Sequence, residues 1–443
     1  MNRPRQRLGA WVVACLLGAT GCATGGPGLF RSPSPYEAYI ATLEQAGLDA
    51  TALGRDWLRA GALATLQPAR VTVPFRETGY FAPETPAAAA YVMDLPRGRR
   101  LVVDVSFDSS APARFFVDLF ELSVDAGQAP RHVASLEPDA ASLSHDVKRD
   151  ASYLLRIQPE LLRGGRFTLV QRTESALAFP VPGLDAGAVQ SGFGVDRDGG
   201  ARGHEGIDIF APRGTPVAAV ADGMARVDTN GLGGNVVWLR DARGRRTYYY
   251  AHLDRWAIEG TVAVTPGDVL GYVGNTGNAR TTSPHLHFGI YEGGAIDPLP
   301  FVQPDDPDPP TPDAPLERLG ERVRVVPART PLRAGPATGA PATAQVERAT
   351  LARVVGVAMG FVRVILHDGS MGYVAANAVT PADVPLRRAR LTTGTVLREN
   401  PGPDQPVVDT VGAPVSAEVL GRSGDYEFVR VPDGASGWLR GHI

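Results

Sequence analysis

The C-terminal part of the chain contains one sequence pattern twice, and this duplication limits the possible folds more than any other feature. Residues 332–336 (LRAGP) return as 397–401 (LRENP), and residues 368–374 (DGSMGYV) return as 433–439 (DGASGWL). Both pairs are offset by 65 residues (332 to 397, and 368 to 433). A colinear repeat indicates two copies of one supersecondary unit, so the sequence predicts two consecutive domains of the same fold.

Each copy has the features of a unit built from short strands. An Asp-Gly pair favours a turn, and the segment after it carries an aromatic residue, Tyr373 in the first copy and Trp438 in the second. These rings either pack in a core or form a platform for a ligand. The L-R-x-x-P start, the D-G-x-x-G turn and the aromatic strand resemble bacterial SH3-like barrels, which implies two modules that bind the cell wall.

The rest of the sequence also predicts a mainly β, multidomain protein. The chain has 443 residues, more than one core normally holds, and its 51 Gly and 38 Pro favour short strands over long helices. Between residues 71 and 172 apolar residues alternate with a period of two, which predicts about seven strands, the first at Val71–Phe75, in a jelly-roll-like β-sandwich. Between Tyr36 and Leu66 apolar residues recur every three to five positions, which predicts two short helices.

The N-terminus has the pattern of a secretory signal. Three arginines precede an apolar run, Leu8 to Leu17, that is too short for a permanent membrane helix. The small residues ending in Cys22 resemble a bacterial lipoprotein cleavage site, although Ala19 stands where that motif usually has leucine. Lipidation explains a lone exported thiol at Cys22, because Cys15 is removed with the signal. The alternative is a plain signal peptide followed by an unmodified cysteine.

Four of the eight histidines lie in one segment that is rich in glycine and apolar residues. His204 and Asp208 form an H-x-x-x-D pattern, and His252 follows an apolar strand-like run. His285 and His287 are two positions apart, so on a strand both imidazoles leave the same face of the sheet. Two such nitrogen donors side by side are costly to bury and seldom needed for folding, so the pattern predicts a metal site.

Zinc suits this set of side chains. A catalytic zinc ion usually takes three protein ligands, from imidazole nitrogen and carboxylate oxygen, and keeps a fourth position for water. Two histidines and one aspartate meet that need, which leaves two histidines beside the metal for proton transfer. The sequence therefore predicts Zn²⁺ as the cofactor.

Residues 190–300 resemble the lysostaphin/LytM-type zinc endopeptidases. The departures are Ser283, where the family often has glycine, and Gly289, where it often has glutamate. Glu205 adjoins the first histidine, but we do not expect it to be catalytic, because a strand neighbour points to the opposite face. The motifs that carry the resemblance are Ser191-Gly192-Phe193-Gly194, Arg202-Gly203-His204, His204-x-x-x-Asp208, Ala221-Asp222-Gly223, Gly234-Asn235-Val236, Tyr250-Ala251-His252-Leu253 and His285-x-His287.

The resemblance implies a role for each of these side chains. The implied zinc ligands are His204, Asp208 and His287, and the implied catalytic residues that do not bind the metal are His252 and His285. The implied domain is an antiparallel β peptidase that hydrolyses peptide cross-links of peptidoglycan.

The expected partners are peptidoglycan and, through the lipid, a membrane. Ala23 after the cysteine favours the outer membrane, facing the periplasm. The net charge of -3 without a polybasic segment argues against nucleic acid, and no protein partner is predicted. The alternatives are a non-catalytic LytM-like activator of another wall hydrolase and a scaffold lipoprotein that binds the wall. The repeats, in turn, are alternatively structural spacers or a cover over the catalytic groove.

These observations divide the sequence into eight parts. They are a signal peptide (1–21), a flexible tether (22–35), a helical segment (36–68), a β-sandwich (70–173), a zinc peptidase domain (177–302), a linker rich in Pro and Asp (303–317), and two SH3-like domains (318–381 and 382–443).

Overall fold

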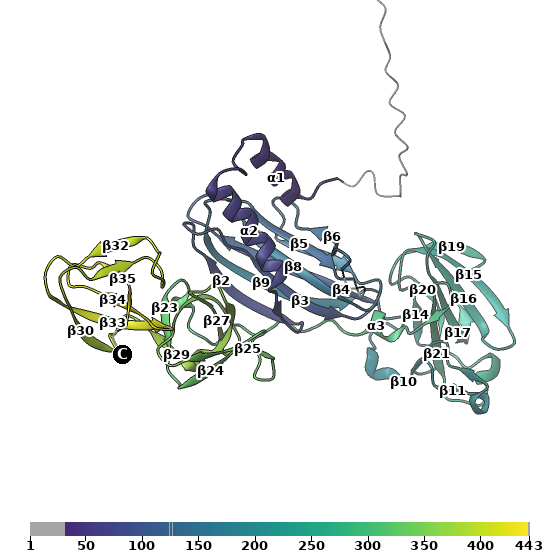
Figure 1. Cartoon of the computed structure of the whole chain (residues 1–443). Coiled ribbons are helices and arrows are strands. Elements are labelled where there is room, and N and C mark those ends of the chain that lie inside the picture. Colours follow the sequence, from purple (N-terminus) through teal and green to yellow (C-terminus); the bar gives the residue numbers. More distant parts are fainter. Residues whose placement is uncertain (1–31, 124, 126, 442–443) are drawn as a thin grey trace, which may run out of the picture.

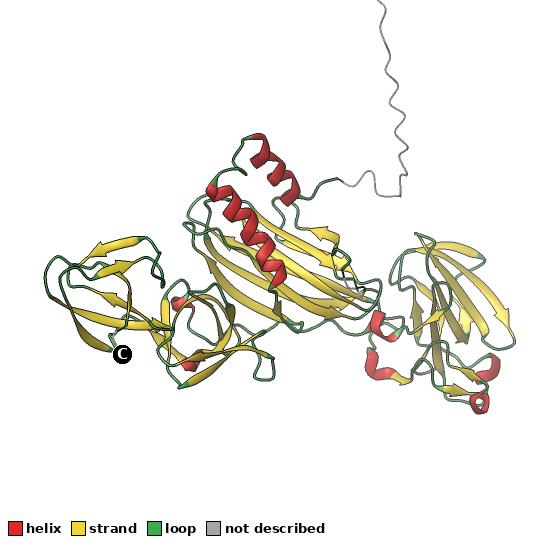
Figure 2. Ribbon diagram, viewed as in Figure 1, coloured by secondary structure: helices red, strands yellow, loops and turns green. Residues whose placement is uncertain are grey.

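The computed structural model describes residues 32–441 except residues 124 and 126. It confirms a mainly β chain with several domains (Figures 1 and 2). The predicted signal peptide and the predicted lipidation site at Cys22 lie outside the described residues. Within the described part, no helix is both long and apolar enough to cross a membrane.

Two helices, α1 (Pro35–Gln45) and α2 (Ala52–Leu66), pack against the β-sandwich. The indole of Trp57 donates a hydrogen bond to the carbonyl of Pro159 at 2.9 Å. The same ring lies in a buried aromatic cluster with Phe116 of the sandwich. The helices therefore cover the outer face of one sandwich sheet (Figure 1).

The β-sandwich consists of two sheets that enclose one core. One sheet has the order β1-β3-β8-β5-β6, and the other contains the run β2-β9-β4-β7. The predicted first strand, Val71–Phe75, is wrong: β1 ends at Arg70 and β2 begins only at Phe75, and Pro74 between them has no N–H to donate. The strands are β1 (Ala69–Arg70), β2 (Phe75–Phe81), β3 (Ala89–Leu95), β4 (Arg99–Asp108), β5 (Phe115–Glu121), β6 (Arg131–Ser135), β7 (Ser142–Asp146), β8 (Ala151–Pro159) and β9 (Gly165–Ser175).

The following domain is built on an antiparallel sheet with the order β10-β13-β21-β17-β16-β15-β19. A smaller sheet, β14-β20-β18, packs beside it, and β11 and β12 form a separate two-stranded ribbon. The elements are β10 (Val189–Ser191), β11 (Asp196–Arg197), β12 (Arg202–Gly203), β13 (Ile207–Phe210), β14 (Pro216–Ala218), β15 (Gly223–Asn230), β16 (Gly234–Asp241), β17 (Thr247–Leu253), β18 (Arg255–Trp256), β19 (Thr261–Val264), β20 (Val269–Tyr272), β21 (His285–Tyr291), β22 (Ala295–Ile296) and α3 (Leu299–Val302).

The two C-terminal repeats have the same strand order. It is β25-β24-β28-β27-β26-β23 in the first and β32-β31-β35-β34-β33-β30 in the second. Each carries a β-bulge at the equivalent position, before Gly356 and before Gly421. The likeness to SH3-like barrels stays a prediction. The strands are β23 (Arg322–Val325), β24 (Arg329–Arg333), β25 (Ala342–Glu347), β26 (Leu351–Ala358), β27 (Phe361–Leu366), β28 (Met371–Ala375), β29 (Val379–Pro381), β30 (Arg387–Leu391), β31 (Val396–Arg398), β32 (Val407–Thr410), β33 (Val415–Ser423), β34 (Tyr426–Arg430) and β35 (Ser436–Arg440).

The first repeat continues a sheet of the sandwich, because β26 pairs with β2. At this junction the Arg363 guanidinium forms an ion pair of 2.7 Å with the Glu77 carboxylate, and both side chains are almost fully buried. Tyr91 and Tyr373 donate their hydroxyls to the same carboxylate. Tyr373 is therefore buried in the interface and is not a platform open to solvent.

The second repeat docks on the first through the face that carries its bulge. Gly421 lies against Leu351, and Trp438 packs in a buried cluster with the same leucine. The aromatic residue of each copy is thus covered by the preceding domain.

The linker rich in Pro and Asp is held along the sandwich. Buried Arg99 donates hydrogen bonds to the carbonyls of Gln303 and Pro304, and the Asp306 carboxylate accepts from the backbone and hydroxyl of Thr173. The sandwich consequently lies between the domain of residues 177–302 and the two repeats (Figure 1).

Candidate metal centre

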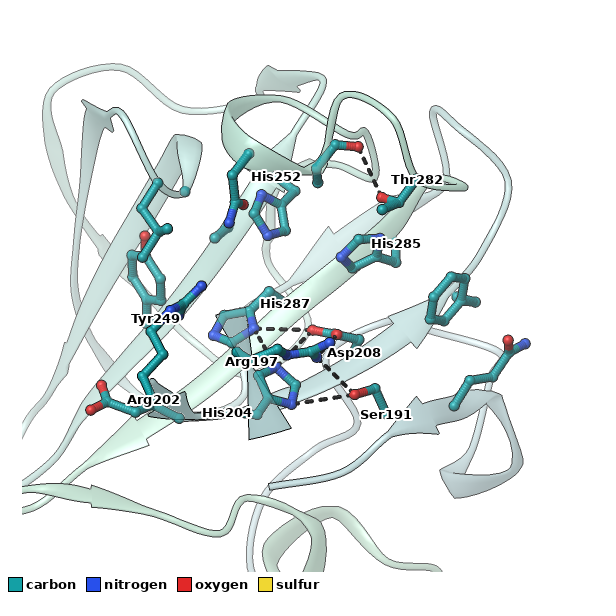
Figure 3. Close-up of a pocket in the computed structure, with 18 of the residues that line it drawn as sticks. Ser191, Arg197, Arg202, His204, Asp208, Tyr249, His252, Thr282, His285 and His287 are labelled. Atoms are coloured by element: carbon teal, nitrogen blue, oxygen red, sulfur yellow. Dashed lines mark hydrogen bonds and ion pairs between the residues drawn. The ribbon is translucent and has the colours of Figure 1, made fainter. Parts of the chain in front are cut away.

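Three neighbouring strands bring the predicted site residues together (Figure 3). Asp208 on β13 lies opposite His287 on β21, and His287 lies opposite Ala251 on β17, one residue before His252. His285 leaves the same face of β21 as His287, as the spacing of two predicts. His204 comes from the loop between β12 and β13 and completes the group.

The three predicted ligands converge on one point. His204 Nε2 lies 3.0 Å from Asp208 Oδ1, and His287 Nδ1 lies 3.0 Å from the same oxygen. The two imidazole nitrogens are 2.9 Å apart. Among the described residues, these three form a group whose donor atoms could hold one metal ion.

The hydrogen bond of His204 Nδ1 shows that the other ring nitrogen, Nε2, faces Asp208 and His287. His204 Nδ1 lies 2.7 Å from the carbonyl oxygen of Gly192, and a carbonyl can only accept a hydrogen bond. The proton of the neutral ring is therefore on Nδ1, and Nε2 turns a lone pair toward Asp208. A lone pair and an anionic oxygen at this distance repel each other unless a cation lies between them. The donor set thus fits Zn²⁺, which binds imidazole nitrogen and carboxylate oxygen.

His252 and His285 are oriented in the same way, beside the group. His252 Nδ1 donates to the carbonyl of Thr276 at 2.9 Å, and His285 Nδ1 donates to the carbonyl of Ser283 at 2.9 Å. Their ring centroids are 5.0 Å apart. In the neutral rings, each Nε2 is consequently left as an acceptor. Both rings line a cavity of about 380 Å³ together with His204, Asp208 and His287.

The backbone at His252 is strained. Its φ is +64°, in the left-handed region that non-glycine residues seldom adopt. The surrounding backbone holds it there: its N–H donates to the carbonyl of Gly233 at 2.8 Å. Such strain is common at functional sites, where the neighbouring structure enforces it.

The electrostatics of the site favour metal binding at neutral pH. Burial raises the pKa of Asp208, but the close contacts with His204 and His287 outweigh it and hold that pKa far below its usual value. Burial and nearby His285 lower the pKa of His252 to about 4. Burial also lowers the pKa of His287, against the pull of Asp208. An ionised carboxylate and a neutral imidazole are the forms that bind a metal ion.

Two residues at the site were not assigned a role from the sequence alone. Arg197 donates to Asp208 Oδ2 at 2.6 Å, and Ser191 lies next to both. The expectation for Glu205 rested on a wrong reason, because β13 begins only at Ile207. Its side chain lines the cavity, where it accepts a hydrogen bond of 3.3 Å from the Tyr291 hydroxyl.

Comparisons with known proteins agree with this geometry. Residues 202–298 match Peptidase family M23. The DD-carboxypeptidase/endopeptidase Mpg of Neisseria meningitidis serogroup B is 43% identical over 104 residues, which cover 23% of this chain and 23% of the relative. The L-Ala--D-Glu endopeptidase of Bacillus subtilis is 37% identical over 141 residues, covering 28% of this chain and 43% of the relative.

Among solved structures, the catalytic domain of the antimicrobial peptidase lysostaphin from Staphylococcus simulans is 32% identical. The match covers 25% of this chain and 87% of that one, with a TM-score of 0.22. The chain spans less than half the length of both curated relatives. The likeness is thus confined to one domain, and the five predicted site residues lie inside it. This chain therefore contains a Peptidase M23 domain, of the lysostaphin/LytM type, at residues 202–298.

Proposed function

We propose that the protein is a zinc-dependent endopeptidase that hydrolyses peptide cross-links of peptidoglycan. The observation that carries this proposal is the convergence of His204, Asp208 and His287 on one point, beside two further imidazoles in an open cavity. The non-catalytic alternative has no such support, because a domain that only binds another protein does not need His252 and His285 in the same cavity as the ligands.

The side chains divide the reaction between them. When bound, zinc activates a water molecule and polarises the carbonyl of the scissile peptide. Both His252 and His285 hold their Nδ1 proton on a backbone carbonyl, so either Nε2 can accept the proton of the water. Once protonated, that nitrogen becomes a donor that protonates the leaving amine.

The names of the relatives support the proposed substrate class. The Neisseria relative is named for DD-carboxypeptidase and endopeptidase activity, and the Bacillus relative is named for cleavage between L-Ala and D-Glu. Those names support the peptide part of the wall as the substrate of this site. We assign the cross-link as the bond that is cut.

The location of the enzyme is part of the proposal. Export followed by lipidation of Cys22 anchors the chain in the outer membrane, facing the periplasm. The accessory β domains then raise the local concentration of the enzyme at the wall. The sequence pattern around Cys22 and the duplicated units support these two points.

The test is digestion of purified peptidoglycan, with the fragments identified by mass spectrometry. We expect the wild-type chain to release cleaved cross-linked peptides and Asp208→Ala to release none. Asp228→Ala is a matched control, since Asp228 is a half-exposed aspartate of the same domain that does not line the cavity. Equal digestion by wild type and Asp208→Ala would refute the proposed enzymatic activity.

A second pair of variants separates catalysis from metal binding. His252→Ala and His285→Ala should lose hydrolysis while they still bind zinc, because neither ring belongs to the three converging ligands. Full activity in both variants would exclude the proposed proton transfer.

A further inference from the structure

One arginine reaches the metal-binding carboxylate from outside the ligand group. Arg197 lies at the end of β11, in the two-stranded ribbon with β12. A single terminal nitrogen of its guanidinium donates to Asp208 Oδ2 at 2.6 Å and to Ser191 Oγ at 2.7 Å. Its side chain is 31% exposed and lines the cavity (Figure 3).

The two oxygens of Asp208 consequently have separate partners. Oδ1 faces the imidazoles of His204 and His287, and Oδ2 faces Arg197. A hydrogen bond between a guanidinium and a carboxylate is short and strong, so it fixes the rotation of the carboxylate. Only Oδ1 then remains directed at the point where the ligands converge.

The backbone around Arg197 holds it in register with the ligands. Asp196 on β11 lies opposite Gly203 on β12, directly before His204. Hydrogen bonds between the backbones of His204 and of Gly194 and Val195 close the ribbon, at 2.8 and 2.9 Å. One small ribbon therefore carries both the His204 ligand and the arginine that holds Asp208.

Ser191 fixes the other end of this contact. It lies on β10, opposite Asp208 on β13. Its hydroxyl oxygen accepts the hydrogen bond from Arg197, which lets one guanidinium nitrogen bridge β10 and β13. The position of the guanidinium is thus set by two strands and the ribbon.

We propose that Arg197 is a positioning residue, which holds Asp208 as a metal ligand through one oxygen and is itself held by Ser191. This inference rests on the metal site of the proposed function. Partners of this kind orient the ligands, and their loss typically weakens metal affinity about 10–100-fold. The positive charge of Arg197 acts in the opposite direction, since it repels a cation. The sign of the change on removing Arg197 therefore tests the positioning role.

The experiment measures the zinc affinity of the full chain by competition with a chromophoric chelator, after removal of metal. We expect Arg197→Gln to bind zinc about 10–100-fold more weakly. Arg197→Lys keeps a charged donor and should retain more affinity than Arg197→Gln. The matched control is Arg226→Gln, because Arg226 is an exposed arginine of the same domain outside the cavity, and its affinity should equal that of wild type.

The role of Ser191 is tested in a double-mutant cycle. Ser191→Ala alone should weaken zinc binding, and it should add little to Arg197→Gln if the hydroxyl acts through the arginine. An additive loss would instead assign the effect of Ser191 to its 3.5 Å contact with His204 Nδ1 and would contradict its place in the inference. The thermal unfolding of the metal-free variants is measured in parallel, and it should stay close to that of wild type if the role is positioning and not general stability.

Several outcomes would overturn the inference. Wild-type or tighter zinc affinity in Arg197→Gln would show that the arginine does not position Asp208. Weaker zinc binding that is matched by a broad loss of metal-free stability would make its role structural. A wild-type chain that binds no zinc would refute the proposed function itself, which distinguishes the two failures.

Discussion

The backbone of His252 shows how a single residue of this site is held against its own preference. A backbone φ of +64° is unfavourable for an L-residue, and His252 adopts it one residue before the end of strand β17. The imidazole nevertheless reaches the cavity because its Nδ1 and its backbone are both hydrogen-bonded. The backbone conformation at His252 therefore costs stability, and it places the ring in the cavity.

This strain predicts an inverted order of two substitutions. His252→Gly should be more stable than His252→Ala by about 1 kcal/mol, because only glycine accepts this φ without strain. At His285, whose φ is not positive, the order should be normal, with the alanine variant the more stable one. Denaturant unfolding gives the free energies. If His252→Ala were more stable than His252→Gly, the backbone at position 252 would not be strained.

A buried carboxylate in the sandwich predicts sensitivity to acid. Burial raises the pKa of Asp118, but hydrogen bonds from His132 and Arg156 and the charge of Arg156 lower it overall. A lowered folded pKa means that ionised Asp118 stabilises the fold above its unfolded pKa, 3.8, and that this stability is lost as the pH falls through the folded value.

The measurement compares wild type with Asp118→Asn across pH. At pH 7 the variant should be less stable by about 3 kcal/mol, because it leaves the buried Arg156 charge without its partner. The difference should shrink as the pH falls below about 4, where wild type also loses the charge. A difference that does not depend on pH would show that the ionised carboxylate is not the cause.

At the scale of elements, strand β2 determines how the repeats attach. It pairs with β9 inside the sandwich and with β26 of the first repeat, so one strand belongs to two domains. Glu77 on β2 is the centre of the junction, because Arg363, Tyr91 and Tyr373 all meet its carboxylate. Removing one member of a buried ion pair leaves an uncompensated charge, which is strongly destabilising.

Glu77→Gln should therefore lower the free energy of unfolding by about 3–5 kcal/mol. Adding Arg363→Met should recover part of this loss, because the unpaired charge is then gone. Asp146→Asn is the control. Asp146 forms an exposed ion pair with Arg100 in the β-sandwich, and this pair should contribute less than about 1 kcal/mol to the free energy of unfolding. Equal losses of stability for Glu77→Gln and Asp146→Asn in denaturant unfolding would show that the buried Glu77 cluster does not stabilise the chain.

At the scale of the whole molecule, the repeats lie at the far side of the sandwich from the metal centre (Figure 1). None of the described residues of the repeats lines the cavity, whose lining comes from residues 190–291. In this arrangement the repeats do not cover the groove. They are fixed to the sandwich and are not joined to it by a free linker.

This arrangement predicts different results for two truncations. A chain ending at residue 383 loses only the second repeat, and it should stay folded and digest soluble wall peptides as wild type does. A chain ending at residue 317 loses both repeats, so Glu77 also loses its partners Arg363 and Tyr373, and the remaining sandwich should have a lower free energy of unfolding. If the second repeat binds the wall, the shorter deletion reduces co-sedimentation with purified sacculi. Unchanged co-sedimentation would assign wall binding elsewhere.

The sequence by itself determined the parts of this protein that depend on local periodicity. The spacing of two in His285-x-His287 places both rings on one face of a strand, and the offset of 65 residues in the repeats reappears in their bulges at Gly356 and Gly421. The alternation of the sandwich located most strands, but it failed at residues 71–74, which lie outside any strand and end in Pro74.

Only the tertiary structure decided which distant residues meet. Nothing near Glu77 in the sequence marks it as a buried anion, because the arginine that neutralises it lies in another domain. Arg197 likewise has no pattern of its own, and its role comes from the ribbon that turns it back toward Asp208. The physical reason is the same in both cases: a charge is stable inside a protein only where the fold supplies its partner.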